Sequence, residues 1–210
     1  MRRVTVDAHS PDPKVLDEAV RLIDAGRVVA LPTDTLYGLA ADPFRADAVD
    51  RVFAIKGRSA GRALPLIAAD EAQVASCIGS LPPIGQRLAR AFWPGPLTLL
   101  VSAPPALAGR VSGGTGRVGV RVPAHAVARA LCRACDRPLT ATSANLSGET
   151  ASADPLEVAR MLGDRIDLLL DAGRTPGGEA STIVDVSESA TRLIRSGAIA
   201  WERIQACIGP

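Results

Sequence analysis

The sequence predicts an α/β fold, in which a twisted, mostly mixed open sheet is flanked by helices. Three observations lead to this prediction. Short apolar segments of strand length alternate with segments of helical periodicity along the chain. The 210 residues are 47% hydrophobic and 22% charged, which suits a globular domain with a sizeable core. No internal repeat or long linker interrupts the pattern, so we expect one domain over residues 1–210.

The first predicted helix has a clear start and end. Asp12 offers an N-cap, and Pro13 occupies the first helical position. Apolar residues between Val15 and Ile23 fall on one face at helical spacing, and Gly26 is placed to terminate the helix. Further helices are expected over residues 46–55, 71–77, 83–92, 124–135, 155–162 and 200–207.

The predicted strands are short and apolar. Val4 and Val6 alternate with polar neighbours, and residues 28–31 form a continuous apolar run that suits a buried strand. Further strands are expected over residues 64–68, 97–101, 118–122, 139–142, 166–170, 182–186 and 193–194. The segments 103–116 and 172–180 are rich in proline and glycine, so we expect them to be surface loops.

Charge and hydropathy narrow the class of protein. The net charge of +2 provides no general case for nucleic-acid binding. No apolar run approaches the roughly 20 residues that cross a bilayer, and the N-terminus lacks the apolar stretch of a signal peptide. We therefore expect a soluble cytoplasmic protein. The chain contains 22 arginines but only two lysines, Lys14 and Lys56, so Lys56 is unusual against this background.

Several familiar motifs fail their context tests. Gly114-Thr-Gly116-Arg-Val-Gly119 matches a dinucleotide fingerprint, but a predicted strand follows it where the fingerprint requires a helix. The pair Cys132 and Cys135 has metal or redox spacing, yet no second pair accompanies it, so packing is favoured. The two histidines have no ligand set nearby, and no Gly-x-Ser-x-Gly sequence is present. We expect no metal held by protein side chains.

Hydroxyls, an amide and cations cluster at predicted strand ends, where open α/β sheets bind ligands. Four segments contain them: Pro32–Gly38, Lys56-Gly-Arg58, Thr142–Asn145 and Ser181-Thr182. Lys56 and Arg58 suit a polyphosphate, and we expect both to be exposed in a loop. Alternatively, they are ordinary cations at a helix C-terminus.

The polar residues around these segments have two interpretations each. In extended backbone Ser143 and Asn145 share a face and can bind phosphate, ribose or carboxylate, although a simple turn has the same composition. Arg121 lies between two valines of a predicted strand and requires an anion when buried. That anion is either a substrate group or an internal partner, for which Asp34 and Asp185 are candidates.

In combination, the motifs resemble the YrdC-type threonylcarbamoyl-adenylate synthases. The resemblance covers nearly the whole chain and depends on the order and spacing of short motifs: Leu31–Leu39, Lys56-Gly-Arg58, Phe92–Thr98, Val120–Pro123, Thr142–Asn145, Ser181–Asp185 and Ile194–Gly197. It implies a YrdC-like fold and an enzyme that forms threonylcarbamoyl-AMP and pyrophosphate from L-threonine, bicarbonate and ATP. It also implies Mg²⁺ carried by ATP and a tRNA threonylcarbamoyl-transferase complex that receives the adenylate.

The resemblance also implies residue roles. It assigns catalysis to Lys56, Arg58, Ser143 and Asn145, and ATP binding to these four together with Arg62, Arg117 and Arg195. It assigns threonine binding to Thr33, Arg121, Ala141 and Ser181. The alternative function is binding of double-stranded RNA or tRNA without catalysis, against which the small net charge and few aromatics argue. A third possible function is that of a hydrogenase maturation factor, a protein that contains a related domain, and we do not expect it for this chain.

Overall fold

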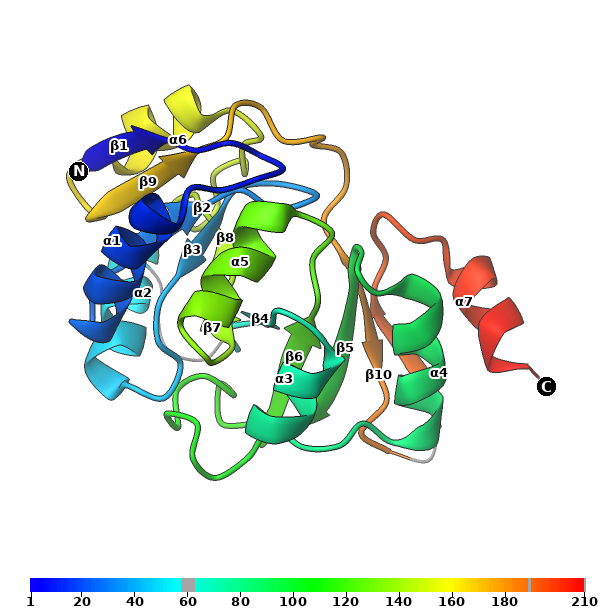
Figure 1. Cartoon of the computed structure of the whole chain (residues 1–210). Helices are drawn as coiled ribbons and strands as arrows, with labels where there is room; N and C mark the ends of the chain where they lie inside the picture. The colour runs from blue at the N-terminus through cyan, green and yellow to red at the C-terminus, as the bar shows by residue number, and fades with distance from the viewer. Residues whose placement is uncertain (58–62, 189, 210) are drawn as a thin grey trace.

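The strands form two mixed sheets that lie side by side in the computed structural model, which describes residues 1–57, 63–188 and 190–209 (Figure 1). The first sheet has the order β1 (Arg2–Thr5), β9 (Leu168–Asp171), β2 (Val29–Leu31), β3 (Gly38–Ala40) and β8 (Thr142–Ser143). The second has the order β11 (Arg192–Arg195), β10 (Thr182–Asp185), β5 (Leu97–Ser102), β6 (Arg117–Arg121), β4 (Leu66–Ile67) and β7 (Leu139–Thr140). Each sheet contains parallel and antiparallel pairs.

The helices match the predicted segments closely. They are α1 (Pro13–Asp24), α2 (Ala46–Lys56), α3 (Glu71–Cys77), α4 (Pro83–Phe92), α5 (Ala126–Ala134), α6 (Pro155–Leu162) and α7 (Trp201–Ile208). The carboxylate of Asp12 accepts from the backbone N–H of Lys14 at 2.9 Å and caps α1. Gly57 ends α2 in the left-handed conformation at φ 62°, where a side chain would be strained.

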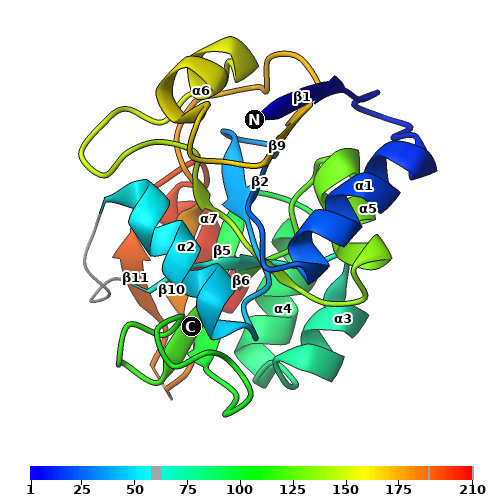
Figure 2. The same ribbon diagram turned by 90° about the vertical axis from the view of Figure 1, so that its left-hand side faces the viewer.

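Two hydrophobic cores pack on opposite faces of the first sheet. Val28 and Ala30 belong to a core that includes α2, whereas Val29 and Leu31 belong to a core that includes α1 and α5. This division follows from the two-residue period of a strand, which sends successive side chains to opposite faces. Figure 2 shows β2 between α2 on one side and α1 and α5 on the other.

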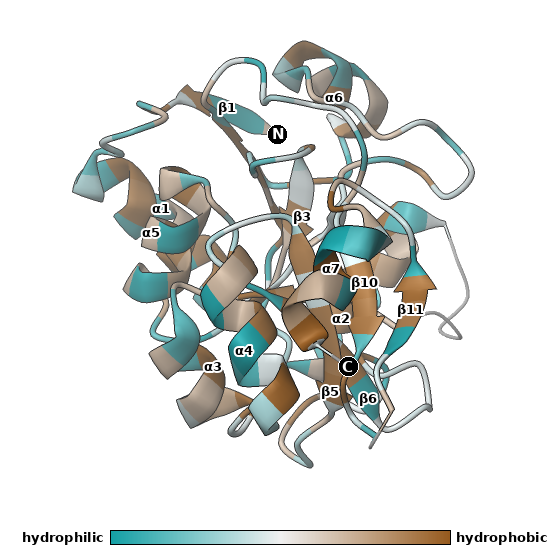
Figure 3. Ribbon diagram, turned by 90° about the vertical axis from the view of Figure 1, so that its right-hand side faces the viewer, coloured by the Kyte–Doolittle hydropathy of each residue, from teal (hydrophilic) through white to brown (hydrophobic). Residues whose placement is uncertain are grey.

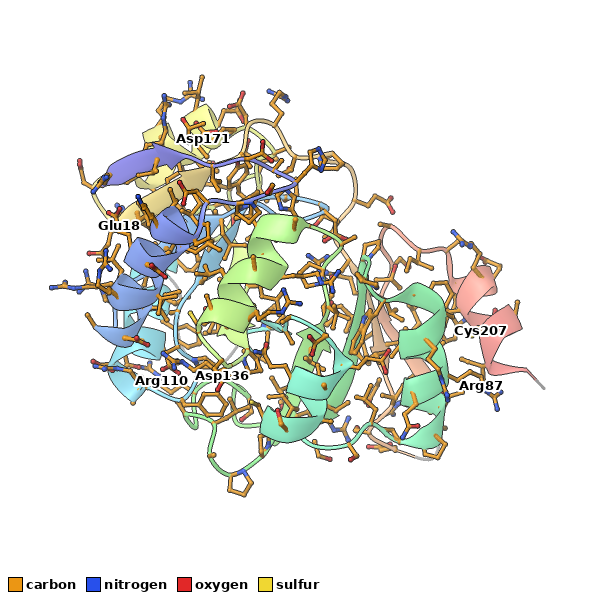
Figure 4. All side chains as sticks on the ribbon, viewed as in Figure 1. Glu18, Arg87, Arg110, Asp136, Asp171 and Cys207 are labelled. Atoms are coloured by element: carbon orange, nitrogen blue, oxygen red, sulfur yellow. The ribbon has the colours of Figure 1, made fainter. Side chains whose placement is uncertain are left out.

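The second sheet is covered by α4, and α7 packs against α4. Figure 3 colours β10 mainly brown, whereas α4 carries both brown and teal, as expected for a helix with one buried face. Figure 4 shows Arg87 of α4 beside the C-terminal helix, where its Nη1 donates to the carbonyl of Ile208 at 2.8 Å. Among the described residues, no helix combines the length and the apolarity needed to span a bilayer.

The predicted fold class is confirmed, with two differences in detail. First, the strands form two sheets, where the sequence predicted one. The run predicted over 139–142 is divided between these sheets at Ala141. The N–H of Ala141 donates to the carbonyl of Pro65 at 2.8 Å, so β7 pairs in the second sheet and β8 in the first. Second, β3 was not predicted. The polypeptide from Leu139 to Ser143 therefore joins the two sheets.

The cysteine pair lies in the core, as the packing interpretation predicts. Cys132 is completely buried in α5, Cys135 caps the end of that helix, and both thiols are free. Burial raises the pKa of both thiols, that of Cys135 to about 12. Neither thiol is therefore a thiolate at neutral pH, which argues against redox chemistry.

Candidate functional site

A cavity of about 580 Å³ lies between the two sheets. The first sheet contributes the Thr33–Tyr37 loop, Gly38 of β3 and the strand β8 to its wall. The second sheet contributes residues of β4, β5, β6, β10 and β11. Such a position at strand ends, with polar groups converging from several elements, is typical of ligand sites in α/β proteins.

Lys56 is buried beside this cavity, at 3% exposure, so the prediction that it is exposed in a loop is wrong. It is the last residue of α2, and its side chain turns inward to the chain segment after β8. Its Nζ donates to the Ser143 carbonyl at 2.7 Å and to Asn145 Oδ1 at 2.6 Å, and it lies 3.3 Å from Ser143 Oγ. Ser143 Oγ donates to the same Asn145 oxygen at 2.6 Å. The predicted grouping of Lys56, Ser143 and Asn145 is thus present as a hydrogen-bonded network.

Within this network only Ser143 lines the cavity. Asn145 is 7% exposed, and its Nδ2 donates to the carbonyl of Glu149 at 2.5 Å. Lys56 and Asn145 therefore support the cavity wall from behind. Arg58 and Arg62, both predicted to bind ATP, lie outside the described residues.

The Thr33–Tyr37 loop is held by its own hydroxyls. Thr33 Oγ1 donates to the carbonyl of Leu36 at 2.7 Å and accepts from the N–H of Thr35 at 3.2 Å. Tyr37 is completely buried, and its hydroxyl donates to the carbonyl of Gly173 at 2.7 Å. Burial raises the pKa of Tyr37 well above its ordinary value, so the hydroxyl remains a neutral donor. Thr33 lines the cavity, and its contact with threonine stays a prediction.

Arg121 extends from the end of β6 into the cavity wall, with 7% of its side chain exposed. Its Nη2 lies 3.3 Å from Asp34 Oδ1, so Asp34 is the internal partner among the two candidates. Burial lowers the pKa of Arg121, and the charge of Asp34 opposes that shift. Asp185 pairs instead with Arg117 at 2.7 Å.

Ser181 and Arg195 lie together on the far wall, in the segment before β10 and at the end of β11. Ser181 Oγ lies 2.8 Å from Thr98 Oγ1 of β5, and Arg195 Nη2 donates to the Ser181 carbonyl at 2.6 Å. Ala141 also lines the cavity. Arg117 does not line it, since its guanidinium is paired with Asp185 and Glu188.

The architecture and the motifs are shared with known proteins. The Sua5/YciO/YrdC family model, described as telomere recombination, matches residues 21–197. The chain belongs to the Sua5/YciO/YrdC family. It is 38% identical over 208 residues to the threonylcarbamoyl-AMP synthase of Bacillus subtilis (strain 168), covering 99% of this chain and 60% of that protein. It is 42% identical over 170 residues to the same-named protein of Halorhodospira halophila, covering 81% of this chain and 88% of that protein.

Solved structures of the Sua5/YciO/YrdC family superpose closely. The crystal structure of P. abyssi Sua5 complexed with L-threonine matches with a TM-score of 0.94 and 34% identity, over 100% of this chain and 61% of that one. E. coli YciO matches with a TM-score of 0.88 at 23% identity, over 98% and 100% of the two chains, which concerns the fold alone. The chain spans about three fifths of the length of the B. subtilis and P. abyssi proteins.

Two residues of the cavity wall, Thr98 and Gly119, were not predicted from the sequence as site residues. Thr98 is 2% exposed and pairs with Ser181, and Gly119 lies diagonally across from it in β6, in register with Leu100. A Cβ on Gly119 would lie 2.9 Å from Thr98 Cγ2, so glycine permits this close approach. Glycine inside a strand often marks such an approach, and this signal was available in the sequence.

The cavity wall does not fit a metal held by the protein. The described residues that line it include hydroxyls and guanidinium groups but no carboxylate, histidine or cysteine. Elsewhere in the described part of the chain, no group of three such side chains could hold a metal ion. A divalent cation at this site would be bound by ligand oxygens, such as those of phosphates.

Proposed function

We propose that the chain is an L-threonylcarbamoyladenylate synthase that converts L-threonine, bicarbonate and ATP into threonylcarbamoyl-AMP, pyrophosphate and water. The observation that carries this proposal is the composition of the cavity. Two arginines and several hydroxyls converge from two sheets without any acidic residue in the described wall. Such a surface favours ligands with a carboxylate and phosphates. Its volume of about 580 Å³ is within the usual range for small-molecule sites.

In this proposal Arg121 binds the carboxylate of threonine, and Thr33, Ala141 and Ser181 surround the amino acid. Support comes from the P. abyssi homologue, whose crystal structure contains L-threonine. The Ser143 hydroxyl faces the nucleotide phosphates, and Arg195 binds them from the opposite wall. Lys56 and Asn145 hold Ser143 in place through the network described above.

The chemistry then needs positioning and charge neutralisation more than a side-chain nucleophile. The carbamate formed from threonine and bicarbonate attacks the α-phosphorus of ATP, the new P–O bond forms, and the bond to pyrophosphate breaks. Fixed donors around the phosphates stabilise the charge that develops on the phosphoryl oxygens. Mg²⁺ arrives with the ATP phosphates, in agreement with the lack of acidic ligands in the described wall.

The downstream partner is a further part of the proposal. A mixed acid anhydride such as threonylcarbamoyl-AMP is a reactive acyl donor, so an acceptor must consume it. The family resemblance indicates a tRNA threonylcarbamoyl-transferase complex in the cytoplasm as that acceptor. Direct contact of this chain with tRNA is the alternative function, which no feature of the cavity favours.

The test is pyrophosphate release by the purified chain. We expect release with ATP, bicarbonate and threonine together, and a decrease to background when either threonine or bicarbonate is omitted. Mass spectrometry of the products should detect the threonylcarbamoyl adenylate. Equal pyrophosphate release without threonine would contradict the proposal, as would tight binding of double-stranded RNA without any adenylate formation.

A further inference from the structure

Asp34 is a buried carboxylate with an unusual environment. Only 12% of its side chain is exposed. Neither of its oxygens has a hydrogen-bond donor among the described residues. Its cationic partner is Arg121, at 3.3 Å from Oδ1. Burying such a carboxylate costs several kcal/mol unless a nearby cation offsets the desolvation.

The two partners differ in their access to the cavity. Arg121 is one of the residues that line the wall, whereas Asp34 is not. The oxygens of Asp34 are shielded from solvent, so a ligand in the cavity cannot reach them. Among the described residues, the Arg121 guanidinium has no other ion pair and no side-chain hydrogen bond. Its remaining donors therefore have no partner within residues 1–57, 63–188 and 190–209.

We propose that Asp34 is a positioning residue that holds the Arg121 guanidinium toward the cavity, where it binds the carboxylate of the amino-acid substrate. This inference rests on the proposed function and extends it to a residue that the motif-based assignments leave out. Asp34 follows β2 directly after Pro32 and Thr33, so the same loop provides a cavity hydroxyl and the counter-ion of the cavity arginine. One short segment would then order two substrate contacts.

The charges at this end of the cavity agree with that role. Arg195 is close enough to Arg121 to lower its pKa, while Asp34 raises it. Two guanidinium groups and one carboxylate leave a single positive charge in excess, which suits the binding of anionic substrate groups here. Without Asp34, the two arginines would repel each other, and Arg121 would lose the contact that orients it.

The test compares two acid–arginine pairs in which the carboxylate is largely buried. Asp34→Asn keeps the shape and removes the charge, and we expect the threonine Kd to rise about tenfold, as for loss of a charge-assisted contact. The Kd for ATP should change less than about twofold. The matched control is Asp42→Asn. Asp42 has a side chain 9% exposed and pairs with Arg137 Nε at 3.0 Å, and neither residue lines the cavity.

The control separates positioning from stability. Both variants should lose thermal stability, but only Asp34→Asn should weaken threonine binding. In an Arg121→Gln background, Asp34→Asn should produce no further increase in the threonine KM, because the two residues act through one contact. Equal weakening by Asp42→Asn, unchanged threonine binding in Asp34→Asn, or additive effects in the double variant would each overturn the proposal.

A substrate-free measurement distinguishes failure of this inference from failure of the proposed function. A fixed guanidinium gives separate NMR signals for its Nη hydrogens, and Asp34→Asn should merge those of Arg121 through faster rotation. If the wild-type chain binds no threonine, the proposed function fails, and so does the role of Asp34 in carboxylate binding. If it binds threonine but the Arg121 signals are identical in both proteins, only the positioning role is overturned.

Discussion

The two walls of the cavity are organised differently. On the first-sheet side, Ser143 is held by a buried lysine and an asparagine through bonds of 2.6 to 2.7 Å. On the second-sheet side, Arg121 has a single ionic contact at 3.3 Å among the described residues. Ser143 is therefore fixed before any ligand binds, whereas Arg121 keeps donors available for one. A fixed network suits the positioning of the phosphates that react, and the available donors of Arg121 suit the carboxylate that must be recognised.

Lys56→Met provides the strongest test of this contrast. It removes the ammonium donor that the Ser143 carbonyl and Asn145 Oδ1 share, and each acceptor keeps one neutral donor, the Asn145 N–H and the Ser143 hydroxyl respectively. Loss of a hydrogen bond to a charged group costs about 1.5–3 kcal/mol. We expect kcat/KM in the pyrophosphate assay to fall about 100-fold, as for misplacement of a positioned catalytic group. Denaturant unfolding should report a lower free energy of unfolding.

The chain contains the ideal control for that substitution, since Lys14 is its other lysine and is exposed on α1. Lys14→Met should leave both the activity and the free energy of unfolding nearly unchanged. Should Lys56→Met retain wild-type stability with only the ATP KM increased, the lysine would be a direct phosphate ligand. The interpretation that Lys56 fixes Ser143 would then be wrong.

Two glycines, one in each wall, sharpen the comparison. A Cβ on Gly119 would lie 2.9 Å from Thr98 Cγ2, whereas one on Gly38 would lie 3.5 Å from the carbonyl oxygen of Thr142, an ordinary contact. Gly119→Ala therefore has to displace Thr98, which pairs with Ser181 at 2.8 Å. We expect the threonine KM to rise about tenfold and stability to fall by about 1 kcal/mol, as for modest overpacking.

Gly38→Ala is the matched substitution on the first-sheet wall. Because its added methyl meets no close neighbour, the threonine KM should change less than about threefold. Steady-state kinetics with threonine as the varied substrate measures both variants. A larger effect at Gly38 than at Gly119 would show that the second-sheet wall is not the one that recognises the amino acid.

The sequence predicted the elements better than their connections. The helices were correct because caps and apolar faces are local signals, as at Asp12 and Gly57. The strand β3 has only three residues, Gly38–Ala40, which is too short for a periodic pattern. The division of residues 139–143 between two sheets depends on the bond from Ala141 to Pro65, and no local pattern indicates such a long-range contact.

The site shows the same division between local and long-range information. The motifs identified Lys56, Ser143 and Asn145, but the inward direction of Lys56 depends on packing that sequence does not reveal. Likewise, Asp34 and Asp185 were equal candidates as partners of Arg121. Position along the strands decides between them, because Asp185 lies in register with Leu100 of β5 and pairs with Arg117, at the opposite end of β6 from Arg121.

The smallest expected effect concerns the hydrogen bonds between the Thr33–Tyr37 loop and the segment that joins β9 to β10. The Tyr37 hydroxyl donates to the Gly173 carbonyl at 2.7 Å and so ties the Thr33–Tyr37 loop to the segment that leads to Ser181. Tyr37→Phe removes this bond and the one that the hydroxyl accepts from the Ala172 N–H at 3.3 Å, and we expect a loss of about 1–2 kcal/mol in the free energy of unfolding.

The threonine KM of Tyr37→Phe should change less than about twofold, because further hydrogen bonds hold the segment between β9 and β10 to the Thr33–Tyr37 loop and so keep Ser181 in position. Thr175 Oγ1 donates to the Thr35 carbonyl at 2.8 Å, and the N–H of Gly177 donates to that same oxygen at 2.9 Å. Combined urea unfolding and threonine kinetics measure both quantities. A threonine KM raised as much as in Gly119→Ala would mean that the first-sheet wall controls amino-acid recognition through this loop, and the separation of roles between the two walls would not hold.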